Sequence, residues 1–278
     1  MALYFTKTSI GHSHLMTNKC CQDFSLSYHD EERTIVAACD GHGSNVYIRS
    51  HLGAKFACEA ALKVLRSVER SAFYPQKRKG VIENLRLNVL CEWNALVETH
   101  LCKKPITRAE VAGLTDSEIL ALRKNPVKAY GTTLNAAMLM GNKMICIALG
   151  DGGCFLIKGG NVLPPFPEDE DEPVANVTYS LCQDDAFAHL QVSIHDTNGY
   201  DGAIVCTDGI LNPYQNLSNF SVGLVAPAVV ALHCGKYRRL EEFVTDMGLR
   251  LGSGDDVSLG LVLKSTLPLR KYSKASEI

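Results

Sequence analysis

Short apolar runs bounded by turn residues dominate the beginning, the middle and the end of the chain. Eight of them have the composition of β-strands: ALYFTKTSI, RTIVAAC, GTTLNAAMLM, KMICIAL, CFLIKGG, LQVSIH, AIVCT and VSLGLVL. The dipeptides Gly141-Asn142 and Gly159-Gly160 fall between such runs and predict tight hairpin turns. Neighbouring strands are therefore expected to run antiparallel, which argues against a simple alternation of parallel strands and helices.

Helical periodicity separates the strand blocks. Apolar residues at four-residue spacing predict a helix over 44–68, and a second helix is expected over about 81–102. Thr115 and Glu118 have the spacing of a capping box and predict the start of a third helix. A late helix is expected over 238–251. Strands in two blocks with long helices between them indicate an α+β fold of packed sheets with helices outside.

Composition limits the class of protein. The chain has 278 residues, 46% of them hydrophobic, and a formal net charge of −2. This balance gives no electrostatic reason to expect nucleic acid or a membrane surface as partner. We expect a cytoplasmic protein, because no leader and no apolar stretch near 20 residues is visible. The 11 cysteines contain no Cys-x-x-Cys spacing, so they are interpreted as reduced core residues rather than disulfides or a zinc site.

Carboxylates recur where the apolar runs end. Asp40, Asp151 and Asp208 each follow a predicted strand and precede glycine, whereas Asp255 stands just before the last strand. An Asp-Gly pair is often only a turn, and a purely structural role is the alternative at each position. Several unpaired carboxylates at the ends of buried strands would, however, be costly without a cation. Oxygen ligands without cysteine or paired histidine favour magnesium, manganese or calcium.

The ordered set QDFS, CDGHGS, YGTTLNAAM, ALGDGG, CTDGI and GDDVSLGLV resembles the metal-dependent, type-2C protein serine/threonine phosphatases. The resemblance covers residues 1–264, nearly the whole chain, and is closest to a bacterial-like variant with a reduced flap. It implies one catalytic domain built as a four-layer α/β/β/α sandwich, with two central antiparallel sheets flanked by helices. The remaining 265–278 is polar and mildly basic, and we expect this tail to fray.

The resemblance also implies a metal centre of Mn²⁺ or Mg²⁺. Asp40 would bridge two ions, and the carbonyl of Gly41 would complete the second one. Asp208 and Asp255 would hold the first ion beside Asp40. Asp151, with Asp208, matches the place where the family binds a weak third ion.

Further residues acquire roles from the same resemblance. Asp23 would support the centre through water or hydrogen bonds, His42 matches the proposed general acid, and 131–133 lies under the metals. The implied reaction is hydrolysis of phosphoserine and phosphothreonine in proteins, opposing a serine/threonine kinase. Two ions about 4 Å apart activate water and clamp the phosphoryl oxygens, while an acid such as His42 contributes ~100-fold by protonating the leaving alkoxide.

The chain departs from the family pattern at several positions. His14 falls about where many members carry a phosphate-binding arginine, so it becomes the candidate substrate-binding residue, the alternative being an ordinary surface histidine. Gln22 replaces a glutamate, and Asn212 replaces an aspartate that often assists the third ion. Asp256 is either a further ligand or a turn residue. Two alternative functions remain: a pseudophosphatase that only binds partners, and a hydrolase of small phosphoesters.

Overall fold

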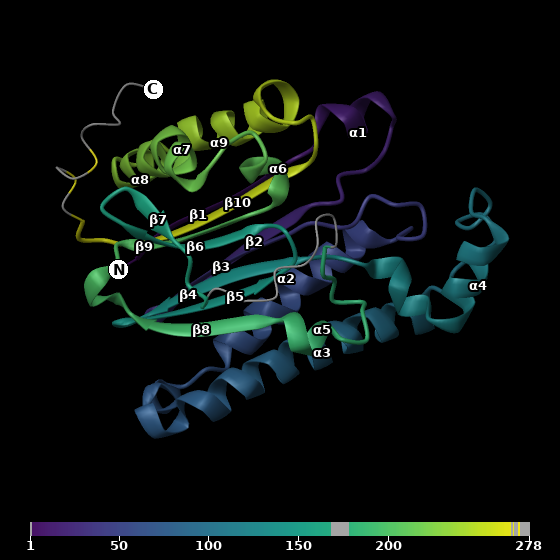
Figure 1. The fold of residues 1–278 in the computed structure, drawn as a ribbon, viewed down its shortest axis with the longest axis horizontal. Coiled ribbons are helices and arrows are strands. Elements are labelled where there is room, and N and C mark those ends of the chain that lie inside the picture. The colour runs from purple at the N-terminus through teal and green to yellow at the C-terminus, as the bar shows by residue number, and fades with distance from the viewer. Residues whose placement is uncertain (1, 168–177, 268, 270–271, 273–278) are drawn as a thin grey trace.

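The computed structural model describes residues 2–167, 178–267, 269 and 272. Two five-stranded antiparallel sheets face each other, and helices cover their outer faces (Figure 1). α2 and α3 lie outside one sheet, and α7, α8 and α9 lie outside the other. The predicted four-layer α+β sandwich is therefore confirmed.

The first sheet has the strand order β1-β10-β9-β6-β7, and the second has the order β2-β3-β4-β5-β8. The strands of the first sheet are β1 Ala2–Ser9, β10 Val257–Lys264, β9 Gly202–Cys206, β6 Gly153–Lys158 and β7 Asn161–Leu163. Those of the second sheet are β2 Phe24–His29, β3 Arg33–Cys39, β4 Leu134–Met140, β5 Lys143–Leu149 and β8 Gln191–Asp196.

The α-helices are α1 His12–Met16, α2 Ser50–Arg66, α3 Arg78–Lys103, α4 Asp116–Lys124, α5 Ala186–His189, α6 Asp208–Leu211, α7 Leu217–Phe220, α8 Ala226–His233 and α9 Tyr237–Asp246. Shorter 3-10 or π turns are η1 Arg70–Phe73, η2 Pro75–Lys77, η3 Pro126–Tyr130, η4 Thr197–Gly199, η5 Ser221–Val225 and η6 Met247–Leu251. Among the described residues, none of these helices is both long and apolar enough to cross a membrane.

Local sequence signals predicted several boundaries correctly. Gly141 and Gly159 adopt φ of 58° and 57° in the two predicted hairpin turns, a region that glycine enters without strain. The Thr115 side chain accepts a hydrogen bond from the Glu118 backbone and completes the capping box of α4. The helix expected over 81–102 is α3, and that expected over 238–251 is α9 continued by η6.

The helix predicted over 44–68 was wrong at its start. Residues 44–49 form turns, and α2 begins at Ser50 after the backbone N–H of Arg49 donates to the carbonyl of Ala129. The first turns of α2 pack closely against η3, because a Cβ at Gly53 would lie 1.9 Å from the Tyr130 carbonyl oxygen. Half-buried Phe56 instead packs beside His100 of α3.

The tail prediction was wrong at one described position. Tyr272 is only 1% exposed, and its hydroxyl donates to Asp201 Oδ2 at 2.6 Å. The aromatic ring lies against Gly160 of the β6–β7 hairpin, so this part of the tail is packed. Much of 265–278, and the acidic loop 168–172, lie outside the described residues.

Candidate active site

The predicted carboxylates meet at one end of the sandwich, from strands of both sheets. Asp40 follows β3, Asp151 follows β5, Asp208 follows β9 by two residues, and Asp255 precedes β10. Their charges act on one another: Asp208, Asp255 and Asp151 all raise the pKa of Asp40. The structure therefore brings together four acids that are up to 215 residues apart in sequence (Asp40 to Asp255).

The electrostatic strain of this cluster appears in two pKa values. Burial, and then the charge of Asp208, raise the pKa of Asp40 to about 7. The pKa of Asp208 is also raised, by burial and by Asp151 and Asp255. The strongest charged neighbours of both groups are other carboxylates, which is the situation that a bound cation would relieve.

Backbone hydrogen bonds fix Asp40 at the end of β3. Its carbonyl oxygen accepts from the Thr132 hydroxyl at 2.7 Å and from the Thr133 backbone at 2.8 Å. Its own N–H donates to Thr133 Oγ1 at 3.0 Å. His42, two residues after Asp40, donates its backbone N–H to the Gly131 carbonyl. Residues 131–133 therefore support the turn, as the resemblance implied.

Glycine is required at position 41 because the chain passes through a narrow space. A Cβ at Gly41 would lie 2.6 Å from the Ser50 carbonyl oxygen and 2.7 Å from that of Gln22. The Gln22 side chain donates to the His42 carbonyl at 3.2 Å and to Ser50 Oγ at 2.6 Å. Gln22 thus holds the Asp40–Gly43 turn against the start of α2.

Asp23 lies beneath Asp40 and is 5% exposed. Burial, then the charge of Asp40, raise its pKa well above the ordinary value. Thr207 donates its hydroxyl to Asp23 Oδ2 at 2.7 Å and accepts from the Ser258 N–H at 2.9 Å. Asp23 therefore lies next to Asp40 on the interior side, where the Thr207 hydroxyl holds it in place.

His42 projects from the same turn and packs against Tyr47, with ring centroids 4.9 Å apart. Burial lowers its pKa, whereas the charge of Asp151 acts in the opposite direction. Asp151 is exposed and accepts a hydrogen bond from the Thr178 hydroxyl. Asn212 donates to Asp208 Oδ2 at 3.0 Å, so this substituted position also lies in the site.

A cavity of about 370 Å³ opens onto the cluster. It is lined by Ser13, His14, Gln22, Asp40, Gly41, Gly43, Asn212, Ser253 and Asp255. His14 thus lines the same cavity as Asp40 and Asp255, and its role as a substrate-binding residue stays a prediction. Throughout the part of the chain that the structure describes, no three His, Cys, Asp or Glu side chains converge tightly enough to form a ready-made metal site. Of the four clustered acids, Asp40 and Asp255 line this cavity, and Asp208 lies next to it through its hydrogen bond with Asn212.

Asp256 is not available as a ligand. It is 2% exposed, and both of its oxygens accept hydrogen bonds from protein groups: Oδ1 from the Gly11 N–H at 2.7 Å, and Oδ2 from the Gln22 N–H at 2.6 Å. Oδ2 also contacts His14 Nδ1 at 2.8 Å. The sequence left open whether Asp256 is a ligand or a turn residue, and the structure makes it a buried hydrogen-bond acceptor.

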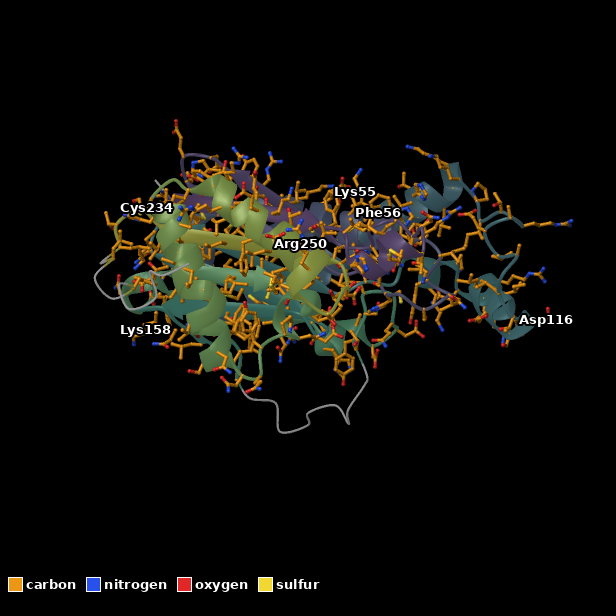
Figure 2. All side chains as sticks on the ribbon, turned by 90° about the horizontal axis from the view of Figure 1, so that it is seen from above. Lys55, Phe56, Asp116, Lys158, Cys234 and Arg250 are labelled. Atoms are coloured by element: carbon orange, nitrogen blue, oxygen red, sulfur yellow. The ribbon has the colours of Figure 1, made fainter. Side chains whose placement is uncertain are left out.

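Sequence patterns did not predict the charged network that Arg49 forms beside the site. Arg49 is 5% exposed, contacts Glu110 at 2.7 and 3.0 Å, and donates to the Tyr130 hydroxyl at 2.7 Å. It also donates to the carbonyls of Lys104 and Pro105. Arg49 thereby fastens the segment after α3, which projects from the body with Asp116 near its far end (Figure 2). A lone arginine before an apolar helix gives no sequence signal of such a role.

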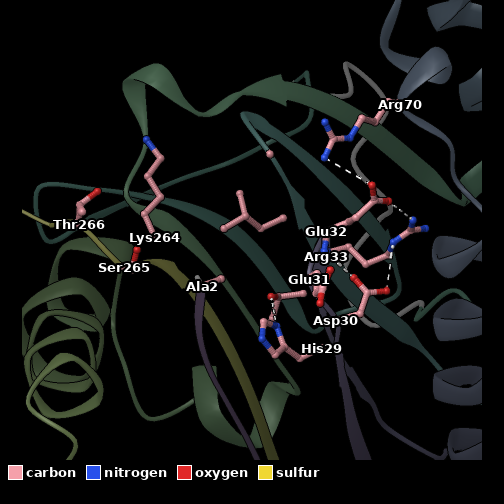
Figure 3. Close-up of a pocket in the computed structure, with 13 residues that line it drawn as sticks. Ala2, His29, Asp30, Glu31, Glu32, Arg33, Arg70, Lys264, Ser265 and Thr266 are labelled. Atoms are coloured by element: carbon pink, nitrogen blue, oxygen red, sulfur yellow. Dashed lines mark hydrogen bonds and ion pairs between the residues drawn. The ribbon is translucent and has the colours of Figure 1, made fainter.

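Two further cavities differ in their relation to the site. One of about 650 Å³ adjoins Tyr47, which packs on His42, and lies between α4 and residues 182–185. The larger of the two, about 730 Å³, lies at the opposite end of the sheets, beside Ala2, Gly141 and Lys264. Figure 3 shows the residues that line it. There Arg33 and Arg70 are paired with Glu32. Since none of the clustered aspartates lines this larger cavity, it is not the active site.

Comparison with known proteins decides the family. The family model described as Protein phosphatase 2C matches residues 10–244. The chain belongs to the protein phosphatase 2C family. It is therefore a metal-dependent protein phosphatase that acts on serine and threonine.

Solved structures of this family have the same fold. The serine/threonine phosphatase Stp1 from Staphylococcus aureus shares 15% identity with a TM-score of 0.59, covering 96% of each chain. A bacterial serine phosphatase shares 16% identity, with a TM-score of 0.57 over 96% of this chain and 98% of its own. The catalytic domain of PstP, solved in complex with two manganese ions, shares 15% identity, covers 94% and 97%, and has a TM-score of 0.54. No curated protein sequence matches the chain.

Proposed function

We propose that Asp40, Gly41, Asp208 and Asp255 hold two Mn²⁺ or Mg²⁺ ions in this phosphatase. The observation that carries the proposal is the convergence of these acids at one end of the sandwich, where burial, and then the charges of neighbouring carboxylates, raise the pKa of Asp40 to about 7. Carboxylate and carbonyl oxygens are the ligands that these ions prefer. Cations bound among these acids would reduce the repulsion between their negative charges.

The fit is also favoured by the space around Gly41. Because Gly41 has no side chain, its backbone fits closely between the carbonyls of Ser50 and Gln22. When bound, two such ions supply an activated water and neutralise charge on the phosphoryl oxygens. Asp23, buried beside Asp40 and held by the Thr207 hydroxyl, would support the centre from the interior.

His42 is proposed as the acid that protonates the departing serine or threonine oxygen. Burial lowers its pKa, which makes the protonated ring a stronger acid. The nearby Asp151 carboxylate favours the protonated form and so opposes the effect of burial. Tyr47 packs against the ring in a tilted arrangement, with ring centroids 4.9 Å apart, which restricts the positions that the ring can take.

Asp151, with Asp208, would bind a third ion only weakly. Asp151 is exposed, and Asn212 supplies a neutral amide where another carboxylate would strengthen the site. We therefore expect two tightly bound ions and a third that binds at high metal concentration. Either Mn²⁺ or Mg²⁺ suits these ligands, so the preferred ion is a matter for measurement.

The expected substrate is a protein phosphorylated by a serine/threonine kinase in the cytoplasm. Two cavities, of about 370 and 650 Å³, flank the Asp40–Tyr47 segment, and both are lined by polar side chains. Such an extended surface suits a peptide on either side of a phosphoresidue. A small phosphoester would fill only the first cavity, and a pseudophosphatase would bind without turnover.

The test compares hydrolysis of a phosphothreonine peptide and of p-nitrophenyl phosphate, with Mn²⁺, with Mg²⁺ and with chelator. Asp208→Asn is the loss-of-function variant, and Asp116→Asn, an exposed acid on α4, is its matched control. Metal-dependent release that Asp208→Asn abolishes supports the proposal. Metal bound in calorimetry without turnover would instead indicate a pseudophosphatase, and turnover of p-nitrophenyl phosphate alone a small-molecule hydrolase.

A further inference from the structure

Asp256 is a buried carboxylate without a role in the proposed metal centre. It accepts three hydrogen bonds, from the backbone of Gly11, the backbone of Gln22 and the ring of His14. Two of these donors bracket the segment 11–22, and the third is the candidate substrate-binding residue. One carboxylate therefore holds the whole segment that carries His14.

The hydrogen bonds determine how the His14 ring is presented. Both backbone donors point at the Asp256 oxygens, so the carboxylate is the acceptor and His14 Nδ1 carries the shared hydrogen. Nε2 is then the ring nitrogen left for a ligand. His14 lines the cavity together with Asp40 and Asp255, so a ligand in the cavity lies against this residue.

The backbone of the segment is also fixed relative to the cluster. A Cβ at Gly11 would lie 2.2 Å from the Asp255 carbonyl carbon, so the two segments are in direct contact. Ser13 reinforces this contact, since its N–H and its hydroxyl both donate to the Gly254 carbonyl at 2.9 and 2.7 Å. The His14 ring is thus anchored at its backbone and at Nδ1.

We infer that Asp256 is a positioning residue that orients His14 Nε2 toward the phosphate group of the substrate. The inference rests on the proposed function, because it assumes that the phosphate binds beside Asp40 and Asp255. A ring held by a carboxylate presents one nitrogen in a fixed direction and loses little rotamer entropy on binding. Protonated at Nε2, it donates a charge-assisted hydrogen bond to a phosphate oxygen.

A histidine oriented by a carboxylate is also the usual arrangement of a metal ligand. Phosphate is favoured here because Mn²⁺ and Mg²⁺ prefer oxygen ligands, whereas an imidazole nitrogen suits zinc, copper, iron or nickel. Metal ligation by His14 is therefore the alternative outcome of the experiment.

The experiment measures inorganic phosphate as a competitive inhibitor, with p-nitrophenyl phosphate as substrate, for wild type, His14→Ala, Asp256→Asn and the double variant. Calorimetry of Mn²⁺ binding and thermal unfolding accompany each variant. His12→Ala is the matched control, because His12 is exposed on the same helix. Loss of a hydrogen bond to a charged group predicts a rise of about 10-fold in Ki for phosphate and in KM in both single variants.

The positioning role predicts a specific pattern in the double variant. Asp256→Asn should add little to Ki once His14 is absent, whereas it should still lower the melting temperature through its lost backbone contacts. If Asp256 were only structural, Asp256→Asn would raise Ki for phosphate equally in the wild-type and the His14→Ala protein. That result would overturn the inference. If Asp256→Asn does not fold, His14→Gln serves instead, and an unchanged Ki in His14→Ala and His14→Gln overturns it.

Two other outcomes are distinguishable. Weaker Mn²⁺ binding in His14→Ala with an unchanged phosphate Ki would make His14 a metal ligand and overturn the inference while leaving the phosphatase intact. A wild-type protein without metal-dependent turnover would reject the proposed function itself.

Discussion

Two charged regions lie on either side of the Asp40–Arg49 segment and differ in how their charges are balanced. In the carboxylate cluster, Asp40 and Asp208 have like-charged neighbours, and their pKa values are raised. In the network around Arg49, hydrogen bonds from the guanidinium hold the pKa of Glu110 down at about 2. The carboxylate cluster is costly without an added cation, whereas in the Arg49 network the opposite charges of the protein neutralise each other.

The difference separates binding from stability. A protein-internal ion pair such as Arg49–Glu110 needs no ligand, so it fixes the segment after α3 in place. In the carboxylate cluster, negative charges repel one another at one end of the sheets. A bound cation would relieve this repulsion, so the cluster favours cation binding. Substitutions in the two regions should therefore change different quantities.

The largest expected effect comes from Asp208→Asn. Metal-dependent hydrolysis of a phosphothreonine peptide should fall by about 1000-fold, because an ion that stabilises transition-state charge loses a ligand. The free energy of unfolding of the metal-free protein should stay the same or increase, since one repelling charge is gone. Initial rates and urea unfolding in chelator measure the two quantities. A variant that loses stability and keeps activity would contradict the comparison.

A second variant, His42→Asn, tests the acid. Loss of proton donation should lower kcat for the phosphothreonine peptide by about 100-fold. The loss should be much smaller with p-nitrophenyl phosphate, because that leaving group departs without a proton. Steady-state kinetics on both substrates check this, and equal losses would mean that His42 acts by another route.

Metal and pH should act together on the stability of the cluster. The folded pKa of Asp40 is about 7 against an ordinary value of 3.8, so the folded metal-free protein holds a proton that the unfolded chain loses. Its free energy of unfolding should therefore decrease as pH rises from about 4 to about 7. Mn²⁺ at about 100 times its Kd should then add roughly 2.7 kcal/mol at neutral pH.

Thermal unfolding at pH 5 and pH 7.5, with chelator and with Mn²⁺, measures this linkage. The gain from Mn²⁺ should be greater at pH 7.5, where the carboxylates are ionised and free to bind. A stability that is independent of metal at both pH values would mean that the cluster binds no cation.

The smallest effect is expected from Glu110→Gln, which breaks the balanced network. Because the Glu110 side chain is 33% exposed, solvent screens the pair, and the loss should be about 1–2 kcal/mol at pH 7. The folded pKa of about 2 lies below the ordinary 4.5, so this contribution is complete above about pH 4.5 and disappears as pH falls toward 2. Urea unfolding of both proteins at pH 7 and pH 3 measures it. Hydrolytic activity should not change, and a large loss of kcat would contradict the separation.

The sequence predicted what depends on local pattern. Asp40, Asp151 and Asp208 were found because each interrupts an apolar run at a glycine turn, and antiparallel neighbours followed from Gly141 and Gly159. These signals lie within a few residues of the features they predict. The family resemblance then supplied the order of the layers, which strand composition alone does not determine.

The remainder depends on contacts between distant residues. His14 meets Asp256 across 242 positions, and Arg49 meets Glu110 across 61, so neither partner can be read from its neighbours. The start of α2 was mispredicted because Ala129 accepts the Arg49 N–H and holds residues 44–49 in turns. Tyr272 is packed by Asp201, which lies 71 residues away.

The pairing of β1 with β10 bears on how the protein is made. The two strands run side by side from Ala2 opposite Lys264 to Ser9 opposite Val257. A ribosome adding roughly 5–20 residues per second therefore completes β1 long before its partner exists. Until β10 emerges, Gly11 and His14 have no Asp256 to hold them, and Asp40 lacks Asp255. A growing chain should thus remain unable to act on phosphoproteins until the sheet closes, and nascent chains truncated before residue 257 should release no phosphate.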